Sequence, residues 1–140
     1  MIRAEHEVAD LLDKFGDALY DRDLEASLAL LAADDQLAII ASEGVDLHRG
    51  FADVSDFMAR IYRGPRRYRW SWNDRWVNVA GTMASFVALG TETLEEADAT
   101  TLIPYCLTGV ARQTPGGWRF ILLHGSEDTA AGVAAPRSNQ

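Results

Sequence analysis

The chain has 140 residues, of which 48% are hydrophobic and 24% are charged, and its formal net charge is −8. This length and composition predict one globular domain that can bury a sizeable core. The negative charge argues against nucleic-acid binding, because a phosphate backbone is bound by a basic surface.

Three helices are predicted in the first half of the chain. Between residues 4 and 20 the apolar residues recur at helical spacing, which predicts an amphipathic helix. Asp23 is a good N-cap for a second helix that extends to Leu31. Gly50 opens a third helix, and Gly64-Pro65 ends it. Its apolar stripe consists of Phe51, Val54, Phe57, Met58 and Ile61.

The remaining elements are predicted to be strands. Residues 36–42 form a short strand that can pair with residues 45–48 as a small hairpin through the turn candidate Glu43-Gly44. Four long strands follow, over residues 68–80, 82–94, 100–114 and 117–127. Strands this long must coil strongly. We therefore expect an α+β fold in which a curved antiparallel sheet closes on three helices as a cone-shaped barrel with a cavity at its open end.

The alternation of side chains along a strand predicts which residues of the last strand share a face. The even-numbered residues from Trp118 to Ser126, including His124, are expected on one side. Arg119, Ile121 and Leu123 are expected on the other.

The domain is predicted to cover residues 1–128, followed by a flexible tail over residues 129–140 that has almost nothing to bury. The single cysteine, Cys106, excludes an internal disulfide and fits a reducing compartment. The N-terminus lacks the apolar core of a signal peptide, and no apolar run approaches the ~20 residues of a membrane span. We therefore expect a cytoplasmic protein with no membrane partner.

Two stretches carry a resemblance to a known family. In the first, Asp23-Leu24-Glu25-Ala26 leads to Asp34-Asp35 and directly into a strand, before Gly50 opens a helix; in the second, Gly117-Trp118-Arg119-Phe120 leads to His124-Gly125-Ser126. Over roughly residues 8–127 the chain resembles the nuclear transport factor 2-like superfamily, in particular its SnoaL-like members. The resemblance implies a cone-shaped α+β barrel with a deep pocket, usually a homodimer joined through the outer faces of the sheets. The superfamily holds isomerases, dehydratases, epoxide hydrolases, polyketide cyclases and non-catalytic association domains, so the fold alone does not define the chemistry.

Ketosteroid isomerases of this superfamily carry a tyrosine in the first helix and a general-base aspartate in the first strand. Counting in this sequence places Phe15 at the tyrosine position and Ile40 near the aspartate position. Neither side chain can move a proton, so the isomerase chemistry is not supported.

Three residues are candidates for acid/base catalysis. His124 would lie at the cavity wall if the even face of its strand looks inwards; alternatively it is a structural histidine bonded to backbone or to Ser126. Glu92 continues the face of Phe86, Ala88 and Gly90, where a carboxylate can serve as a base, although it could equally be solvated. Tyr105 is the third candidate.

A further set of mainly aromatic residues is predicted to line the ligand pocket, although plain core packing is the alternative for the tryptophans. The set is Tyr20, Phe57, Trp70, Trp72, Phe86, Trp118, Phe120 and Ser126. No metal site is expected, because His6, His48 and His124 lack the spacing of metal ligands.

We therefore predict a cofactor-free SnoaL-like pocket protein for a small, mostly apolar, aromatic or polyketide-like molecule, with acid/base chemistry of the isomerase, dehydratase, cyclase or hydrolase type. It should form a homodimer through Val87, Leu89, Ile121 and Leu123 on the outer sheet face. The alternative is a non-catalytic dimeric binding or association module. A filled cone, or a His124 that faces bulk water, would overturn the small-molecule prediction and leave only a dimeric scaffold.

Overall fold

The computed structural model describes residues 2–42 and 46–128. Within these ranges three helices and six strands follow one another: α1 (Ile2–Asp21), α2 (Leu24–Leu28), β1 (Ala38–Ile40), β2 (Leu47–Arg49), α3 (Phe51–Arg63), β3 (Arg67–Ala80), β4 (Met83–Glu96), β5 (Ala99–Thr114) and β6 (Gly117–Glu127). The three helices, the small N-terminal hairpin and the four long strands predicted from the sequence are confirmed. The turn at Glu43-Gly44 and the tail over residues 129–140 lie outside the described residues.

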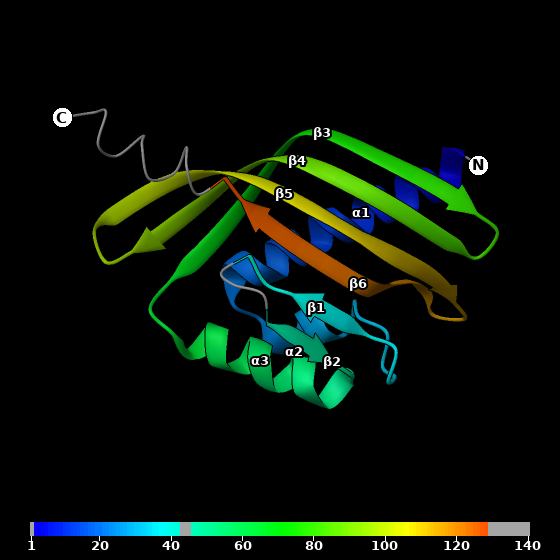
Figure 1. Ribbon diagram of the computed structural model, residues 1–140, viewed down its shortest axis with the longest axis horizontal. Coiled ribbons are helices and arrows are strands. Elements are labelled where there is room, and N and C mark those ends of the chain that lie inside the picture. Colours follow the sequence, from blue (N-terminus) through cyan, green and yellow to red (C-terminus); the bar gives the residue numbers. More distant parts are fainter. Residues whose placement is uncertain (1, 43–45, 129–140) are drawn as a thin grey trace.

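The strands form one curved sheet in the order β2-β1-β6-β5-β4-β3. Figure 1 shows the long strands as an arched layer with α1 running along it, while α2, α3, β1 and β2 gather below. The α+β class and the curved sheet packed on three helices are confirmed, and the structure adds two details. The sheet does not close, and β1 pairs with β6 in parallel, whereas the other neighbouring strands are antiparallel.

The inner face of the sheet is filled by aromatic rings toward the β5–β6 turn. Phe120 is 0% exposed, and its ring meets Phe15 of α1 edge-on at 5.7 Å between centroids and Phe86 of β4 at 5.5 Å. Trp118 is also buried, and its indole nitrogen donates to Glu7 Oε1 at 3.2 Å. We call the part of the inner face around Phe86, Trp118 and Phe120 the filled end.

The helices α2 and α3 are joined by a buried polar contact. Ser27 of α2 is fully buried; its hydroxyl donates to the Asp23 carbonyl at 2.9 Å, and its oxygen lies 2.7 Å from the Tyr62 hydroxyl of α3. Because the serine proton is directed at Asp23, the Tyr62 hydroxyl donates to the serine. Asp23 caps α2 as predicted, by accepting from the Ala26 backbone N–H at 3.0 Å.

A β-bulge in β6 changes the face on which its later residues lie. Ala111 of β5 pairs with Phe120, but the preceding Val110 pairs with Leu122, so Ile121 is an extra residue. An extra residue reverses the alternation of every side chain beyond it. The expected common face of Phe120 and His124 is therefore wrong.

Beyond this bulge, Leu123 and Gly125 face inwards, whereas His124 and Ser126 are exposed. Leu123, which was expected on the outer face, is only 3% exposed. The outer face of the sheet therefore keeps Val87, Leu89 and Ile121 from the predicted set and loses Leu123. Leu89 is 39% exposed, and Val87 and Ile121 are partly exposed.

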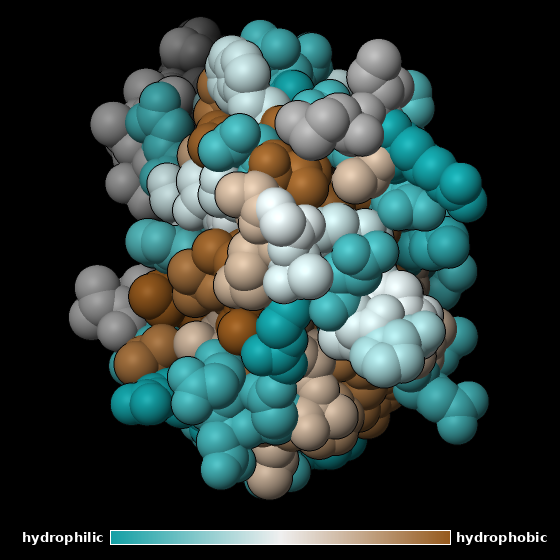
Figure 2. Space-filling view, turned by 90° about the vertical axis from the view of Figure 1, so that its right-hand side faces the viewer, coloured by the Kyte–Doolittle hydropathy of each residue, from teal (hydrophilic) through white to brown (hydrophobic). Residues whose placement is uncertain are grey.

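The molecular surface alternates between polar and apolar regions. Figure 2 shows apolar side chains exposed in patches between polar ones on the end of the molecule that it views. None of the described helices is both long enough and apolar enough to cross a membrane. The cytoplasmic location stays a prediction.

Candidate functional site

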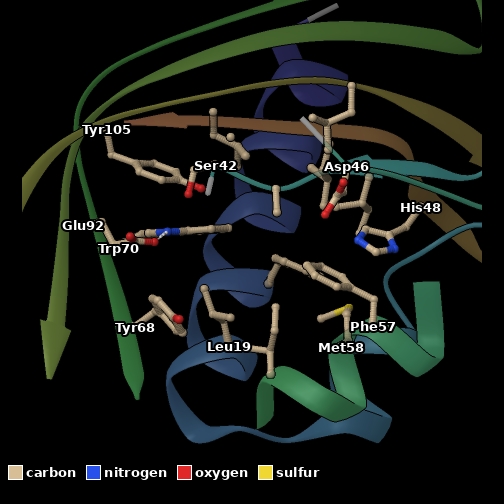
Figure 3. A pocket seen from close by; sticks show the side chains of 18 of the residues that line it. Leu19, Ser42, Asp46, His48, Phe57, Met58, Tyr68, Trp70, Glu92 and Tyr105 are labelled. Carbon is tan, nitrogen blue, oxygen red and sulfur yellow. Dashed lines mark hydrogen bonds between the residues drawn. The ribbon is translucent and has the colours of Figure 1, made fainter. Parts of the chain in front are cut away.

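A cavity of about 220 Å³ lies between the inner face of the sheet and the helices α1 and α3 (Figure 3). It occupies the part of the inner face beyond the β6 bulge. Most of its wall is apolar, but carboxylate, imidazole, phenol and hydroxyl groups also reach it. The lining residues are Phe15, Leu19, Ile39, Ile40, Ala41, Ser42, Asp46, His48, Phe57, Met58, Ile61, Tyr62, Tyr68, Trp70, Glu92, Tyr105, Leu107, Leu123 and Gly125.

Glu92 is the buried carboxylate of this cavity. It follows Ala84, Phe86 and Ala88 on the inward row of β4 and is 4% exposed. Across the β3–β4 ladder it is paired with Trp70, whose indole N–H donates to Glu92 Oε2 at 3.0 Å. Figure 3 shows both side chains on the strand side of the cavity. A carboxylate this well buried is uncommon unless it is paired or functional.

Tyr105 lies beside this pair on the inward row of β5. Its ring stacks on that of Trp70 at 5.7 Å between centroids, with 27° between the planes. Burial is the largest cause that raises the pKa of the Tyr105 phenol above its ordinary value, and the negative charge of Glu92 adds to it; hydrogen bonding to Ser42 acts in the opposite direction. The phenol therefore stays protonated at neutral pH and can donate a hydrogen bond into the cavity.

Gly125 provides the space that the Tyr105 hydroxyl occupies. A Cβ atom at residue 125 would lie 2.1 Å from the Tyr105 hydroxyl oxygen, which is far inside contact distance. The bulge at Ile121 and the glycine at 125 together set the position of this phenol.

The opposite side of the cavity carries polar residues that the sequence reasoning missed. His48 of β2 stacks on Phe57 of α3 at 3.9 Å between ring centroids, and its Nδ1 lies 3.7 Å from Asp53 Oδ1. Asp46 lies next to it in Figure 3. Ser42 was also missed, but it lies beside Tyr105, and its hydroxyl donates to Glu127 Oε2 at 2.8 Å. The predicted hairpin was the available signal, because it brings residues on both sides of its turn to one edge of the cone.

Two missed tyrosines could have been found from spacing. Tyr68 precedes Trp70 by two residues on β3 and so shares its face. Tyr62 follows Met58 by four residues on α3 and so continues the apolar stripe of that helix. Both line the cavity.

The predicted site residues divide into four groups in the structure. Phe57, Trp70, Glu92 and Tyr105 line the cavity. Tyr20 and Trp72 line a second, more polar hollow of about 520 Å³ between α1 and β3, which Trp70 also reaches. Phe86, Trp118 and Phe120 belong to the packed core. His124 and Ser126 are exposed on the other face of β6, so they do not line the cavity as predicted. The bulge at Ile121 is the reason.

The five arginines between residues 60 and 69 do not line the cavity. Arg67 and Arg69 lie over the ring of Tyr20 at 4.9 and 3.8 Å from its centroid, and Arg66 pairs with Glu96 at 3.1 Å. Among the described residues that line the cavity there is neither lysine nor arginine. The described residues also contain no group of three or more His, Cys, Asp or Glu side chains that could hold a metal ion.

The arrangement suits the transfer of a proton and the binding of an oxygen atom. Glu92 can accept or return a proton, and the neighbouring Tyr105 hydroxyl can donate to a ligand oxygen in the same apolar surroundings. Phe15 and Ile40, which occupy the isomerase positions, both line the cavity and offer no proton. Any acid/base chemistry here therefore uses groups on other strands than in those isomerases.

Comparison with solved structures gives the same fold. The chain is similar to a candidate dehydratase of the NTF2-like family from Streptomyces avermitilis (18% identity, 88% of this chain and 94% of that chain covered, TM-score 0.80). It is also similar to a candidate aromatic ring hydroxylase from Novosphingobium aromaticivorans (17%, 91% and 91%, 0.81). A candidate calcium/calmodulin-dependent protein kinase type II association domain from Thiobacillus denitrificans is 24% identical (84% and 91%, 0.71).

No curated protein matches the chain. The solved structures, each under 25% identical, show the fold alone. The SnoaL-like domain, in contrast, matches residues 8–130, which is most of the sequence. The chain belongs to the SnoaL-like domain family.

Proposed function

We propose that this SnoaL-like chain binds a small, mostly apolar molecule in the Glu92 cavity and carries out cofactor-free proton transfer on it. The observation that carries the proposal is a carboxylate, 4% exposed, on the wall of a largely apolar cavity of about 220 Å³. A carboxylate in such surroundings is a typical general acid or base.

The sequence set two conditions for a small-molecule function, a hollow cone and a His124 inside it. A cavity of about 220 Å³ supports the first condition, but His124 is exposed, so the small-molecule prediction fails in the form drawn from the sequence, and this outcome favours the non-catalytic alternative. The proposal made here rests instead on Glu92, which the sequence also nominated, as the acid/base group, with Tyr105 as the hydrogen-bond donor. Trp70 holds the carboxylate through its indole N–H.

The reaction is proposed at the level of its class. Glu92 would take a proton from a ligand carbon while Tyr105 donates to the oxygen that becomes negative. Glu92 would then return this proton either to another carbon, which completes an isomerisation, or to a hydroxyl that leaves as water, which completes a dehydration. Both steps are those of isomerases, dehydratases and cyclases, and neither needs a cofactor. One of the similar structures is a candidate dehydratase, which supports the second version.

The test is a screen of small cyclic ketones and alcohols for binding by thermal unfolding and for turnover, followed by two variants. We expect Glu92→Gln, which keeps an acceptor for Trp70, to lower turnover at least about 100-fold. Tyr105→Phe, which removes only the hydroxyl, should lower it by about 100-fold as well. Turnover that survives Glu92→Gln in a folded protein would refute the catalytic part of the proposal.

A non-catalytic dimeric module is the second candidate, favoured by apolar side chains on the outer sheet face. Leu89 is 39% exposed and Trp76 is 55% exposed, and Trp76 is paired with Val87 across β3 and β4. We propose a homodimer through Val87, Leu89 and Ile121. Sedimentation equilibrium should show Leu89→Asp as a monomer, while Leu47→Asp on the edge strand β2 stays dimeric. Dimers without binding or turnover of any screened ligand would favour this candidate.

A further inference from the structure

We infer that the cavity selects its ligand by charge and that this ligand is a small one-ring amine, bound as its ammonium ion. The inference rests on the proposed function, because it names the class of molecule that the Glu92 cavity holds. It depends on three features of the lining: its charges, its size and its aromatic faces.

The charged groups of the lining favour a cation. Glu92 and Asp46 reach the cavity from opposite sides, as Figure 3 shows, and no lysine or arginine is among the described lining residues. The net charge of the whole chain is −8, which adds a long-range field of the same sign. A ligand carboxylate would enter this space against both groups, whereas an ammonium ion would be attracted by both.

The two carboxylates do not contribute equally. Asp46 is exposed, so water and salt screen its charge. Glu92 is 4% exposed, and interactions with its charge are strengthened by the apolar surroundings. We therefore expect Glu92 to dominate the selection and Asp46 to make a smaller contribution.

The size and walls of the cavity define the rest of the ligand. A dry cavity of about 150 Å³ is enough for benzene in another protein. The 220 Å³ here therefore fits one ring with a short substituent. Trp70, Tyr105 and Phe57 supply aromatic faces, which pack against a ring and also attract a cation.

An ammonium group also suits Glu92 as a hydrogen-bond partner. It offers only hydrogen-bond donors, and a carboxylate only accepts. A positive charge beside Glu92 favours the ionised form of that side chain, which is the form that binds the ammonium ion.

The experiment compares three probes of one shape, benzylamine, benzyl alcohol and benzoate, by isothermal titration calorimetry at pH 7. The order expected for the Kd values is benzylamine tightest, then benzyl alcohol, with benzoate weaker than benzylamine by at least about tenfold. Benzoate binding as tightly as benzylamine overturns the inference and leaves the proposed pocket function in place. Binding of none of the three overturns both.

Variants then assign the selection to the cavity. Glu92→Gln should reduce the benzylamine-to-benzoate preference at least about tenfold, and Asp46→Asn about two- to threefold. Asp98→Asn removes a charge in the exposed β4–β5 turn and should leave the preference unchanged. An equal loss in Asp98→Asn and Glu92→Gln would mean that net charge alone selects, which overturns the inference. If circular dichroism shows that Glu92→Gln is unfolded, the order of the three Kd values and the effect of Asp46→Asn decide whether the inference holds.

Discussion

The two ends of the inner sheet face are built from the same strands, but one end is packed with side chains and the other encloses a cavity. At the filled end Trp118, Phe120 and Phe86 close the space between the sheet and α1 with rings. At the cavity β6, β5 and β4 present Gly125, Tyr105 and Glu92 in turn, and a space of about 220 Å³ remains. The extra residue Ile121 separates the two on β6. Stability should therefore depend mainly on the first end and function on the second.

The largest loss of stability is expected from a substitution at the filled end. Phe120→Ala removes a fully buried ring that contacts Phe15 and Phe86, and the cavity left behind cannot be filled by its neighbours. We expect the free energy of unfolding to fall by about 3–5 kcal/mol. Urea unfolding followed by tryptophan fluorescence measures it. Leu102→Ala on the surface is the control, with a change of about 0.5 kcal/mol or less.

A smaller loss of stability is expected at Gly125, where β6 packs tightly against Tyr105. Gly125→Ala places a methyl group 2.1 Å from the Tyr105 hydroxyl oxygen, so the phenol or the strand must move. We expect a cost of about 1–3 kcal/mol and weaker ligand binding, because the hydroxyl no longer faces the cavity in its present position. Ser126→Ala, one residue further and exposed, is the matched control. Equal stability of the two variants would contradict the close approach.

The hydrogen bond between α2 and α3 gives the next smaller loss of stability. Tyr62→Phe removes the hydroxyl that donates to buried Ser27, and we expect a loss of about 1 kcal/mol. The loss should be seen in urea unfolding at pH 7.

Tyr62 also makes the stability of the fold depend on pH. Burial is the main cause that raises the pKa of Tyr62 from its ordinary value of 10.0 to about 12. Between these values the unfolded chain loses the phenol proton while the folded chain keeps it. The contribution of the Tyr62 phenol to the free energy of unfolding is therefore fully present below pH 10 and is lost as the pH rises toward 12. Unfolding midpoints between pH 9 and 11 should fall more steeply for the wild type than for Tyr62→Phe; parallel curves would contradict the assignment.

The sequence was sufficient for the elements and for the position of four residues on the cavity wall, Phe57, Trp70, Glu92 and Tyr105. The stripe of α1, the cap at Asp23 and the turns between the long strands follow from local spacing. Glu92 and Tyr105 could be placed because β4 and β5 have no bulge between their core residues and the site, so alternation holds along them.

The position of His124 could not be predicted, for a physical reason. The residues from Phe120 to Leu123 are all apolar, so the pattern reads equally well with or without an extra residue among them. The shift is visible only in the pairing with β5, which is a tertiary contact. His48 and Asp46 were missed for a related reason. His48 lies in strand β2 of the short hairpin and Asp46 just before it, and only the folded sheet brings this hairpin to the cavity.

The smallest expected effect follows from this shift and separates the two faces of β6. His124→Ala removes an exposed imidazole on the side away from the cavity, so unfolding free energy should change by about 0.5 kcal/mol or less. Ligand binding and any turnover should equal those of the wild type, whereas Glu92→Gln in the same assay should lower turnover and weaken the preference for benzylamine. A loss in His124→Ala comparable to that in Glu92→Gln would place the imidazole at the ligand, and the face given by the Ile121 bulge would be wrong.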